Sequence, residues 1–486
     1  MLDTFTEDKT GGFMSKVLNN IIEFDGHIQK KSRQNPLNLQ TFFNQPERIF
    51  ATNPYLYRQQ QRESNARSYP RRIPLSLNRG QGIYVQDTQQ QIFIDCLAAA
   101  GTLALGHNHP EVTAAVSQTL HSGMPLQALD LATPVKDQFI EQLFNLLPGK
   151  MAEQARIQMC SPCGSDAVEA AIKLAKIATG RHKILAFSGA YHGMTQGALN
   201  LMGNLGPKSA INMSGADVHI MPFPYAPRCP YGLGEGGVKA SLYQLKTLLT
   251  DPESGIQKPA AIIVEAVQGE AGALPADFAW LKGLREITTE HDIVLIIDEI
   301  QAGMGRTGKV FAFEHAEIEP DMIVLSKALG GGQPLAAIVY SNKLDKWSPG
   351  AHAGTFRGNQ LALAAGQVVF RHLAEENLHF HAEEMGCLLK NRLSLIDSPI
   401  IGDVRGRGLM LGVEIVDPMG AKDSLGNFPQ DGTRALAVQQ AALKRGLIVE
   451  TGGRFGSTIR FLPPLIVNFQ EIKAIAEIFA EAVYSS

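Results

Sequence analysis

The sequence predicts an α/β fold with a large, mainly parallel, doubly wound sheet and a C-terminal α+β part. Short apolar runs alternate with stretches of helical periodicity between residues 156 and 340. The runs lack apolar–polar alternation, which is typical of parallel strands that are covered on both faces. Polar residues directly follow several runs, at the strand ends where sheets of this kind bind ligands.

The expected elements follow one another along the chain. Residues 80–95 alternate like a short meander, and a turn-rich loop, GTLALGHNHP, occupies 101–110. Helical periods begin at Glu111 and recur, for example, at 165–179 and 278–291. The expected strands of the large sheet are 156–160, 183–187, 218–221, 261–265, 293–298, 322–325 and 336–340. The C-terminal part contains RGRGLMLGVEIV at 405–416 and a closing helix from about residue 470.

Composition narrows the class of protein. A chain of 486 residues with 44% hydrophobic and 19% charged residues is expected to form more than one globular domain. The net charge of −3 gives no excess of positive charge that would favour binding to nucleic acid or to an anionic membrane. The N-terminus has no signal-peptide pattern and no run of about 18 apolar residues occurs, so we expect a cytoplasmic protein. Cys160 and Cys163 form a single CxxC without a second pair, and no metal site is expected.

Two polar residues after neighbouring runs carry the strongest chemical signal. Asp298 ends the run 293–298, and Lys327 follows the run 322–325 across Ser326. The ends of neighbouring parallel strands face one crevice, so we expect the carboxylate and the amine to meet there. This pair suits pyridoxal phosphate, because Lys327 would form a Schiff base and Asp298 would partner the pyridinium nitrogen. At about 4 Å and an effective dielectric of about 20, that charge pair is worth about 4 kcal/mol.

Simpler interpretations of these residues stay open. Asp298 and Glu299 could form a solvated strand end, and Lys327 could be a surface lysine. The segment GMGRTGK at 303–309 is nearly a P-loop, but Val310 lacks the hydroxyl that would bind magnesium. Nucleotide binding is therefore disfavoured.

This stretch resembles the class III aminotransferases, pyridoxal phosphate enzymes of fold type I. The shared pattern is Asp-Glu-Ile-Gln-x-Gly at 298–303, Gly-Arg-x-Gly at 305–308 and Ser-Lys-x-Leu-Gly-Gly at 326–331. The resemblance extends from about Pro74 to the C-terminus. It implies a large cofactor-binding domain and a small α+β domain built from both chain ends. The limits that it implies are 1–47 for an N-terminal extension, 48–110 and 366–486 for the small domain, and 111–365 for the large domain.

A second motif is expected to bind the cofactor's phosphate. Gly164 and Ser165 lie between an expected strand and helix, where free N–H groups and the helix dipole attract anions. An ordinary capped helix is the alternative. The family places the phosphate on a Ser-Gly-(Ser/Thr) loop here. Cys163 departs from that pattern at the first position but leaves the backbone donors in place.

The resemblance implies further cofactor contacts. Tyr191, followed by His192, would stack on the pyridine ring, although a core or rim aromatic is the alternative. Ile300 would pack against the opposite face of the ring, and Gln301 would bond its phenolic oxygen. Thr355 matches the family residue that bonds the phosphate of the neighbouring subunit's cofactor, which implies a homodimer with shared sites.

The resemblance also implies substrate contacts. Arg405, before Gly-x-Gly, would bind the α-carboxylate of the 2-oxo acid. Glu270 matches the glutamate that pairs with this arginine in ω-aminotransferases, and Glu265 matches a supporting carboxylate. A solvated salt bridge is the simpler alternative for these residues.

Two segments, ESNARSYPR at 63–71 and PYAPRCPYG at 224–232, are similar to one branch of the family. That branch transfers the 4-amino group of L-2,4-diaminobutyrate to 2-oxoglutarate, giving L-aspartate 4-semialdehyde and L-glutamate. Other ω-amine donors, 4-aminobutyrate or ornithine, are the first alternative. An aminomutase or decarboxylase that uses the same cofactor is the second. A non-enzymatic regulator is disfavoured, because no DNA-binding module or basic patch is visible.

Overall fold

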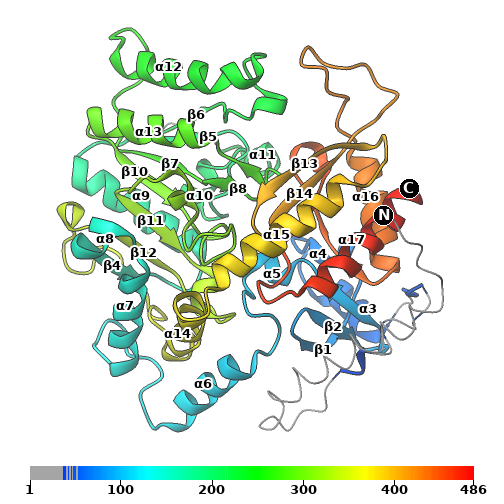
Figure 1. The fold of residues 1–486 in the computed structure, drawn as a ribbon. Helices are drawn as coiled ribbons and strands as arrows, with labels where there is room; N and C mark the ends of the chain where they lie inside the picture. Colours follow the sequence, from blue (N-terminus) through cyan, green and yellow to red (C-terminus); the bar gives the residue numbers. More distant parts are fainter. Residues whose placement is uncertain are drawn as a thin grey trace, which may run out of the picture.

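The computed structural model describes residues 37–39, 42, 45, 47–50, 53–213, 215 and 217–486. The expected N-terminal extension, 1–47, lies almost entirely outside these residues. The centre of the described part is a seven-stranded sheet in the order β4-β12-β11-β10-β7-β5-β6 (Figure 1). Its strands are β4 (Ala155–Met159), β5 (Ile184–Phe187), β6 (Val218–Met221), β7 (Ala261–Val264), β10 (Val294–Asp298), β11 (Met322–Leu325) and β12 (Ala337–Ser341).

The sheet is mainly parallel, as the uniform apolar runs predict. β10 pairs in parallel with β7 and β11, and β5 pairs in parallel with β6 and β7. β12 is antiparallel to both of its neighbours, β11 and β4. β7, β10 and β11 are buried at every position, which explains why their sequences do not alternate.

Alternate residues of β10 point to two different apolar layers. Val294 and Ile296 pack with the buried face of α9 (Gly164–Thr179). Leu295 and Ile297 belong to the main core, together with residues of α13 (Phe278–Glu290) and α14 (Gln360–Ala374). Helices therefore cover both faces of the sheet. Polar side chains can then gather only at the edges, such as the carboxyl ends of the parallel strands.

Two smaller sheets stand beside the large one. The first, in the order β1-β2-β3-β15, combines β1 (Leu77–Gln81), β2 (Tyr84–Asp87) and β3 (Ile92–Asp95) with β15 (Leu447–Ile448). The second, in the order β13-β14-β17-β16, is antiparallel and contains β13 (Ile401–Arg407), β14 (Met410–Ile415), β16 (Glu450–Gly452) and β17 (Thr458–Phe461). The parallel pairing of β15 with β3 joins segments from opposite ends of the sequence.

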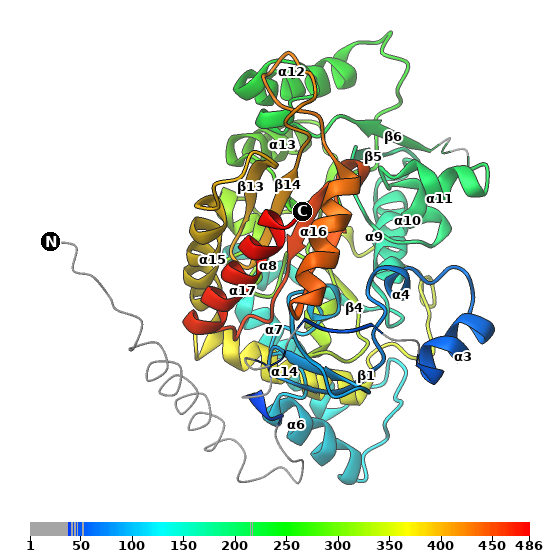
Figure 2. The same ribbon diagram turned by 90° about the vertical axis from the view of Figure 1, so that its right-hand side faces the viewer.

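Figures 1 and 2 show the same union of the chain ends, with the blue N-terminal strands below the orange and red C-terminal helices. These helices are α16 (Gly432–Lys444) and α17 (Phe469–Tyr484), while α15 (Leu378–Ser394) lies along β13 and β14. The short helix α4 (Tyr69–Arg72) reaches the second small sheet, because Arg72 Nη1 donates to the Thr451 hydroxyl at 2.8 Å. None of the helices in the described ranges has the length and apolar character needed to cross a membrane.

Candidate active site

The ends of β10 and β11 bring Asp298 and Lys327 to one edge of the sheet. Asp298 of β10 is paired with Val324 of β11, and Lys327 follows Val324 by three residues. The Asp298 carboxylate is buried, and its Oδ1 accepts a hydrogen bond from the Ile300 N–H at 3.0 Å. Its Oδ2 lies 2.8 Å from Nδ1 of His192. The site predicted from Asp298 and Lys327 therefore also contains the imidazole of His192.

His192 is fully enclosed beside Asp298. Burial alone would lower the pKa of His192, but the hydrogen bond and the charge of Asp298, with a contribution from Glu265, outweigh burial and raise it. Its Nε2 is buried and has no hydrogen-bond partner among the described residues. The His192 ring therefore holds one oxygen of the Asp298 carboxylate, and the Ile300 N–H holds the other.

Lys327 follows β11 in an unusual conformation. Its φ is +50°, a left-handed backbone that costs a non-glycine residue about 1–2 kcal/mol. Burial lowers the pKa of its amine, and the charges of Glu270 and Asp298 oppose that effect. No hydrogen bond or ion pair of this amine exists within the described ranges, so a half-buried, partner-free nucleophile stands at the strand end.

The N-terminus of α9 provides an anion-binding loop. Cys163, the N-cap residue, forms no side-chain cap, and the N–H groups of Gly164 and Ser165 are without partners among the described residues. A Cβ at Gly164 would lie 2.8 Å from Cδ1 of Ile300, so glycine is required for this close approach. The Ser165 hydroxyl accepts from the N–H of Met194 at 3.2 Å and thereby holds the loop that carries Tyr191 and His192.

Glu265 anchors the same loop from the end of β7. Its Oε1 accepts from the Tyr191 N–H at 2.8 Å, and its Oε2 accepts from the Gly269 N–H at 2.9 Å. Burial raises its pKa to about 7, against the effect of nearby His192. The Tyr191 ring remains partly exposed, and the charge of Glu270 adds to burial in raising the pKa of its hydroxyl. Glu265 therefore positions Tyr191, which stands close to Glu270.

The expected pairing of Glu270 with Arg405 is wrong. Arg405 is buried, and its Nε donates to the Gly272 carbonyl at 2.8 Å. Its Nη1 contacts Asp403 and Glu414 at 3.1 and 3.2 Å, and its Nη2 donates to Thr458 at 2.8 Å. All three nitrogens are occupied by this chain, so Arg405 is held as part of the small sheet.

The segment 224–232 completes the enclosure of Arg405. The Tyr225 hydroxyl donates to Asp403 at 2.5 Å, and Nε of Arg228 donates to Glu414 at 2.8 Å. The carboxylates that hold Arg405 are therefore themselves fixed by side chains of the segment 224–232. Such a network leaves little freedom for Arg405 to bind a substrate carboxylate.

Glu270 pairs with Arg460, which the sequence reasoning missed. Oε1 of Glu270 lies 2.9 Å from Nη2 of Arg460, and Oε2 of Glu450 lies 2.6 Å from the same nitrogen. Nε and Nη1 of Arg460 are buried without partners among the described residues. The sequence does carry a sign of this pair, because Arg460 lies within the strand Thr458–Phe461. A charged side chain that is buried in a strand requires partners of opposite charge.

Two further residues were predicted to contact the cofactor. Nε2 of Gln301 donates to the carbonyl of Ala100 at 2.9 Å, so this side chain is fixed by the short helix α5 (Ala98–Gly101). Thr355 is exposed. Its neighbour Gly354 lies against Ser161, because a Cβ at Gly354 would be 2.4 Å from the Ser161 Oγ. The Thr355 loop thus runs beside the expected phosphate loop, the segment that leads into α9.

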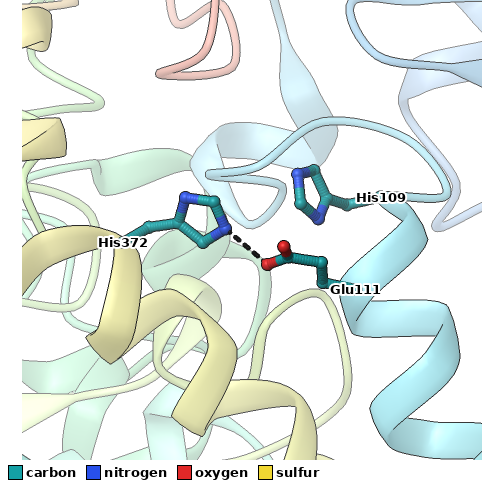
Figure 3. A group of neighbouring side chains, drawn as sticks. All are labelled: His109, Glu111 and His372. Carbon is teal, nitrogen blue, oxygen red and sulfur yellow. Dashed lines mark hydrogen bonds and ion pairs between the residues drawn. The ribbon is translucent and has the colours of Figure 1, made fainter. Parts of the chain in front are cut away.

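Two groups of side chains that could ligate a metal occur among the described residues. Figure 3 shows His109, Glu111 and His372, with Nε2 of His372 2.9 Å from Oε2 of Glu111. Nδ1 of His372 lies 2.8 Å from Glu376, and Arg371 bonds to Glu111. The group therefore forms a hydrogen-bonded ion-pair network that ties α6 (Pro110–His121) to α14. A second group, Cys160, Asp166 and His352, lies beside the phosphate loop, where Asp166 accepts from Ser161 and His352.

The residues at the sheet edge fit pyridoxal phosphate. Partner-free N–H groups at Gly164 and Ser165 suit a phosphate, a buried carboxylate at Asp298 suits a pyridinium, and Lys327 offers a free amine. An α/β fold with these features can hold such a cofactor at the carboxyl ends of its parallel strands.

Comparison with known proteins gives the family. The model of the family "Aminotransferase class-III" matches residues 66–483. The chain is 53% identical over 88% of its length to a diaminobutyrate–2-oxoglutarate aminotransferase of Rhizobium meliloti, covering 92% of that protein. It is 47% identical over 91% of its length to the Haemophilus influenzae protein of the same name, covering 98% of that protein. The chain belongs to the class III aminotransferases.

A solved structure agrees with this assignment. The chain superposes with a TM-score of 0.76 and 25% identity on an amine transaminase from an uncultivated Pseudomonas species in its PLP-bound form. The match covers 87% of this chain and 98% of the other. The fold is therefore fold type I, with a large, mainly parallel central sheet.

Proposed function

We propose that this protein uses pyridoxal phosphate to transfer the 4-amino group of L-2,4-diaminobutyrate to 2-oxoglutarate. The observation that carries the proposal is the partner-free, half-buried amine of Lys327 near the Asp298–His192 pair. The names of the relatives support the choice of donor, as do the segments 63–71 and 224–232. The products are L-aspartate 4-semialdehyde and L-glutamate, and the reaction is reversible.

The residues that would hold the cofactor lie at or just beyond the ends of β4, β5 and β10. Gly164 and Ser165 would bind its phosphate through their free N–H groups. Asp298, held in place by His192, would bind the ring nitrogen, while Tyr191 and Ile300 would enclose the ring. Gln301 would face its phenolic oxygen. When bound, the cofactor carries the amino group between substrates and withdraws electrons from the bond that breaks at the donor carbon.

Lys327 has two tasks in this proposal. Its amine would hold the cofactor, and during turnover its Nζ would take the proton from the donor carbon that carries the reacting nitrogen. A neutral amine is needed for the second task, and burial lowers the pKa of Lys327 in the required direction. The left-handed backbone at Lys327 fixes the direction in which this amine leaves the strand end.

Arg460, rather than Arg405, is the proposed site for the α-carboxylate of 2-oxoglutarate and glutamate. Its two unpartnered N–H groups are buried, and a carboxylate is the natural ligand for them. Glu270 covers Arg460 when the substrate presents no carboxylate beside its reacting carbon. Glu270 must then move aside for 2-oxoglutarate, so the two half-reactions place opposite demands on one ion pair.

The proposed assembly is a homodimer with shared sites. The exposed Thr355 loop lies next to the phosphate loop, and it is the segment that would reach the cofactor of a neighbouring subunit. The domain limits expected from the sequence, with the large domain at 111–365, belong to the same proposal.

A panel of amino donors tests the reaction. Purified protein is incubated with 2-oxoglutarate and each of L-2,4-diaminobutyrate, L-ornithine and 4-aminobutyrate, and glutamate formation is followed. The expected order of kcat/KM places diaminobutyrate first. An equal or higher value for 4-aminobutyrate would overturn the donor but not the aminotransferase. Consumption of diaminobutyrate without glutamate formation would favour an aminomutase or a decarboxylase.

A further inference from the structure

Two histidines and a glutamate meet where α6 packs against α14. His109 directly precedes α6, Glu111 lies in the first turn of that helix, and His372 lies in the last turn of α14 (Figure 3). The atoms with which these three side chains could bind a metal all lie within 4.8 Å of one another. The two imidazole rings are nearly perpendicular, with their centroids 5.2 Å apart, and the carboxylate of Glu111 lies beside both.

Two atoms of this group have no partner. Nδ1 of His109 is buried and forms no hydrogen bond within the part of the chain that the structure describes. Oε2 of Glu111 bonds to His372 and Arg371, whereas its Oε1 has no partner in the same part of the chain. A buried imidazole nitrogen without a partner is costly, and both a ring nitrogen and a carboxylate oxygen are common metal ligands.

His372 is held between two carboxylates. Its Nε2 lies 2.9 Å from Glu111, and its Nδ1 lies 2.8 Å from Glu376. A neutral imidazole carries a single N–H, so it can donate to only one of these carboxylates. Either a second proton completes the other bond, or Nε2 presents its lone pair to a cation while Nδ1–H donates to Glu376. The second arrangement is typical of metal-binding histidines, because the carboxylate fixes the orientation of the ring.

The charges around this group can accommodate a divalent cation. Glu111 and Glu376 contribute two negative charges and Arg371 contributes one positive charge, so an ion with two neutral imidazoles brings the total to +1. Burial, with the nearby charge of His372, lowers the pKa of His109 to about 4, so this imidazole is neutral at pH 7. The side chain of Glu111 is 49% exposed, so water screens the remaining positive charge.

We propose that His109, Glu111 and His372 bind a zinc ion, with Glu376 as the residue that positions His372. Two imidazoles and one carboxylate are a recurrent donor set for Zn²⁺, and water supplies the fourth ligand. At ordinary bond lengths, tetrahedral ligand atoms stand about 3.3 Å apart, so no pair in this group needs to close by more than about 1.5 Å. Rotation of the exposed Glu111 side chain allows such a movement.

The ion would have a structural role. It would join the loop before α6 to α14, two segments whose histidines are 263 positions apart in the chain. α14 also packs against η6 (Lys327–Gly330), where a Cβ at Gly366 would lie 2.3 Å from the carbonyl oxygen of Leu329. An ion that binds the folded chain and not the unfolded one stabilises the fold, and here it would stabilise the helix that supports the lysine segment.

Titration of the holoenzyme with Zn²⁺ and Co²⁺, after dialysis against a chelator, tests the site. Calorimetry is expected to find one tight Zn²⁺ site per chain, and Co²⁺ should give the visible absorption of a four-coordinate ion without thiolate ligands. Glu111→Gln and His109→Gln should each weaken Zn²⁺ binding by about 100-fold or more, and Glu376→Gln by about tenfold. Saturating Zn²⁺ should raise the thermal midpoint of the wild type by about 2–4 °C but not that of Glu111→Gln. His352→Gln, in the second group of potential ligands, is the matched control and should keep the wild-type affinity.

Three results would overturn the zinc site. The first is an equal Zn²⁺ affinity in the wild type, Glu111→Gln and His109→Gln. The second is a thiolate band with Co²⁺ or weaker binding in His352→Gln, which would place the ion at Cys160. The third is the absence of saturable binding, which would show that a second proton on His372 completes the network. Circular dichroism verifies folding, and the exposed Glu111→Gln decides the matter if His109→Gln does not fold. None of these measurements depends on the aminotransferase reaction, so the two proposals can fail separately.

Discussion

Arg405 and Arg460 flank Gly412 in the second small sheet, one from each neighbouring strand. Gly412 of β14 pairs with Arg405 of β13 and with Arg460 of β17. A Cβ at Gly412 would lie 2.6 Å from the Gly272 carbonyl, so this glycine allows the loop that follows Glu270 to rest between the arginines. The two guanidinium groups are close in space, but one is enclosed by its own chain and the other keeps free donors.

Because the two arginines differ in their partners, substitution of Arg460 should impair activity and substitution of Arg405 should impair stability. Arg460→Lys should lower kcat/KM for glutamate by about 100-fold, because a lysine cannot present two parallel N–H groups to a carboxylate. Arg405→Lys should mainly lower the thermal midpoint of unfolding, because it leaves buried Glu414 short of a partner. Steady-state kinetics and thermal unfolding of both variants check this. A selective loss of glutamate activity in the Arg405 variant, with Arg460→Lys active, would restore the original assignment.

Glu270→Gln should impair the two half-reactions unequally. Without the carboxylate, Arg460 stays uncovered when a donor enters, so the donor half-reaction is expected to slow by about tenfold or more. The glutamate half-reaction needs Arg460 uncovered and should be relatively spared. Single-turnover absorbance changes with each substrate measure both rates. Equal losses would argue against a movable cover.

Lys327→Ala should abolish turnover, because the chain then has no amine at the reacting position. Borohydride treatment of the wild-type protein with bound pyridoxal phosphate should fix the label on Lys327, as peptide mass spectrometry can verify. Exposed Lys309, in the adjacent glycine-rich segment, provides the control, and Lys309→Ala is expected to retain activity and label. Label on Lys309 instead would refute the role of Lys327.

Thr355→Ala should weaken retention of the cofactor while leaving the fold intact, because the side chain is exposed in the single chain. Dialysis followed by absorbance gives the loss of cofactor, and light scattering gives the mass. A fully active monomer during turnover would contradict shared sites.

Acid should destabilise the protein in part through His109. Burial, with the nearby charge of His372, lowers the pKa of His109 from 6.5 to about 4, and Glu111 and Glu376 oppose this. The unfolded chain therefore binds a proton more readily, so this contribution to stability is complete above pH 6.5 and is lost as the pH falls through 4. Thermal unfolding from pH 7 to 4 should show a shallower decline for His109→Gln than for the wild type. Replacing exposed His121 with Gln should leave the slope unchanged.

The apolar runs were sufficient to predict the large sheet. The strands at 218–221 and 322–325 match β6 and β11, and the others differ by a residue or so at an end. This succeeds because strands buried on both faces must be apolar throughout, and their polar ends then stand out. The same logic brought Asp298 and Lys327 together before any contact was known. The imidazole beside Asp298 was named in the sequence only through a resemblance, and the ion pair itself came from the fold.

The local sequence does not determine which arginine pairs with Glu270. Glu270 and Arg460 are separated by 190 positions in the chain, and their contact depends on the register of β14 with β17 and on the path of the loop at Gly272. Arg405 has the more conspicuous motif, yet Asp403, Glu414 and the segment 224–232 occupy its donors. The sequence by itself determined the class of fold, the lysine and the carboxylate, because burial of consecutive residues leaves a local signature. Only the tertiary structure decided which arginine remains free, because competition among distant carboxylates for one guanidinium leaves no such signature.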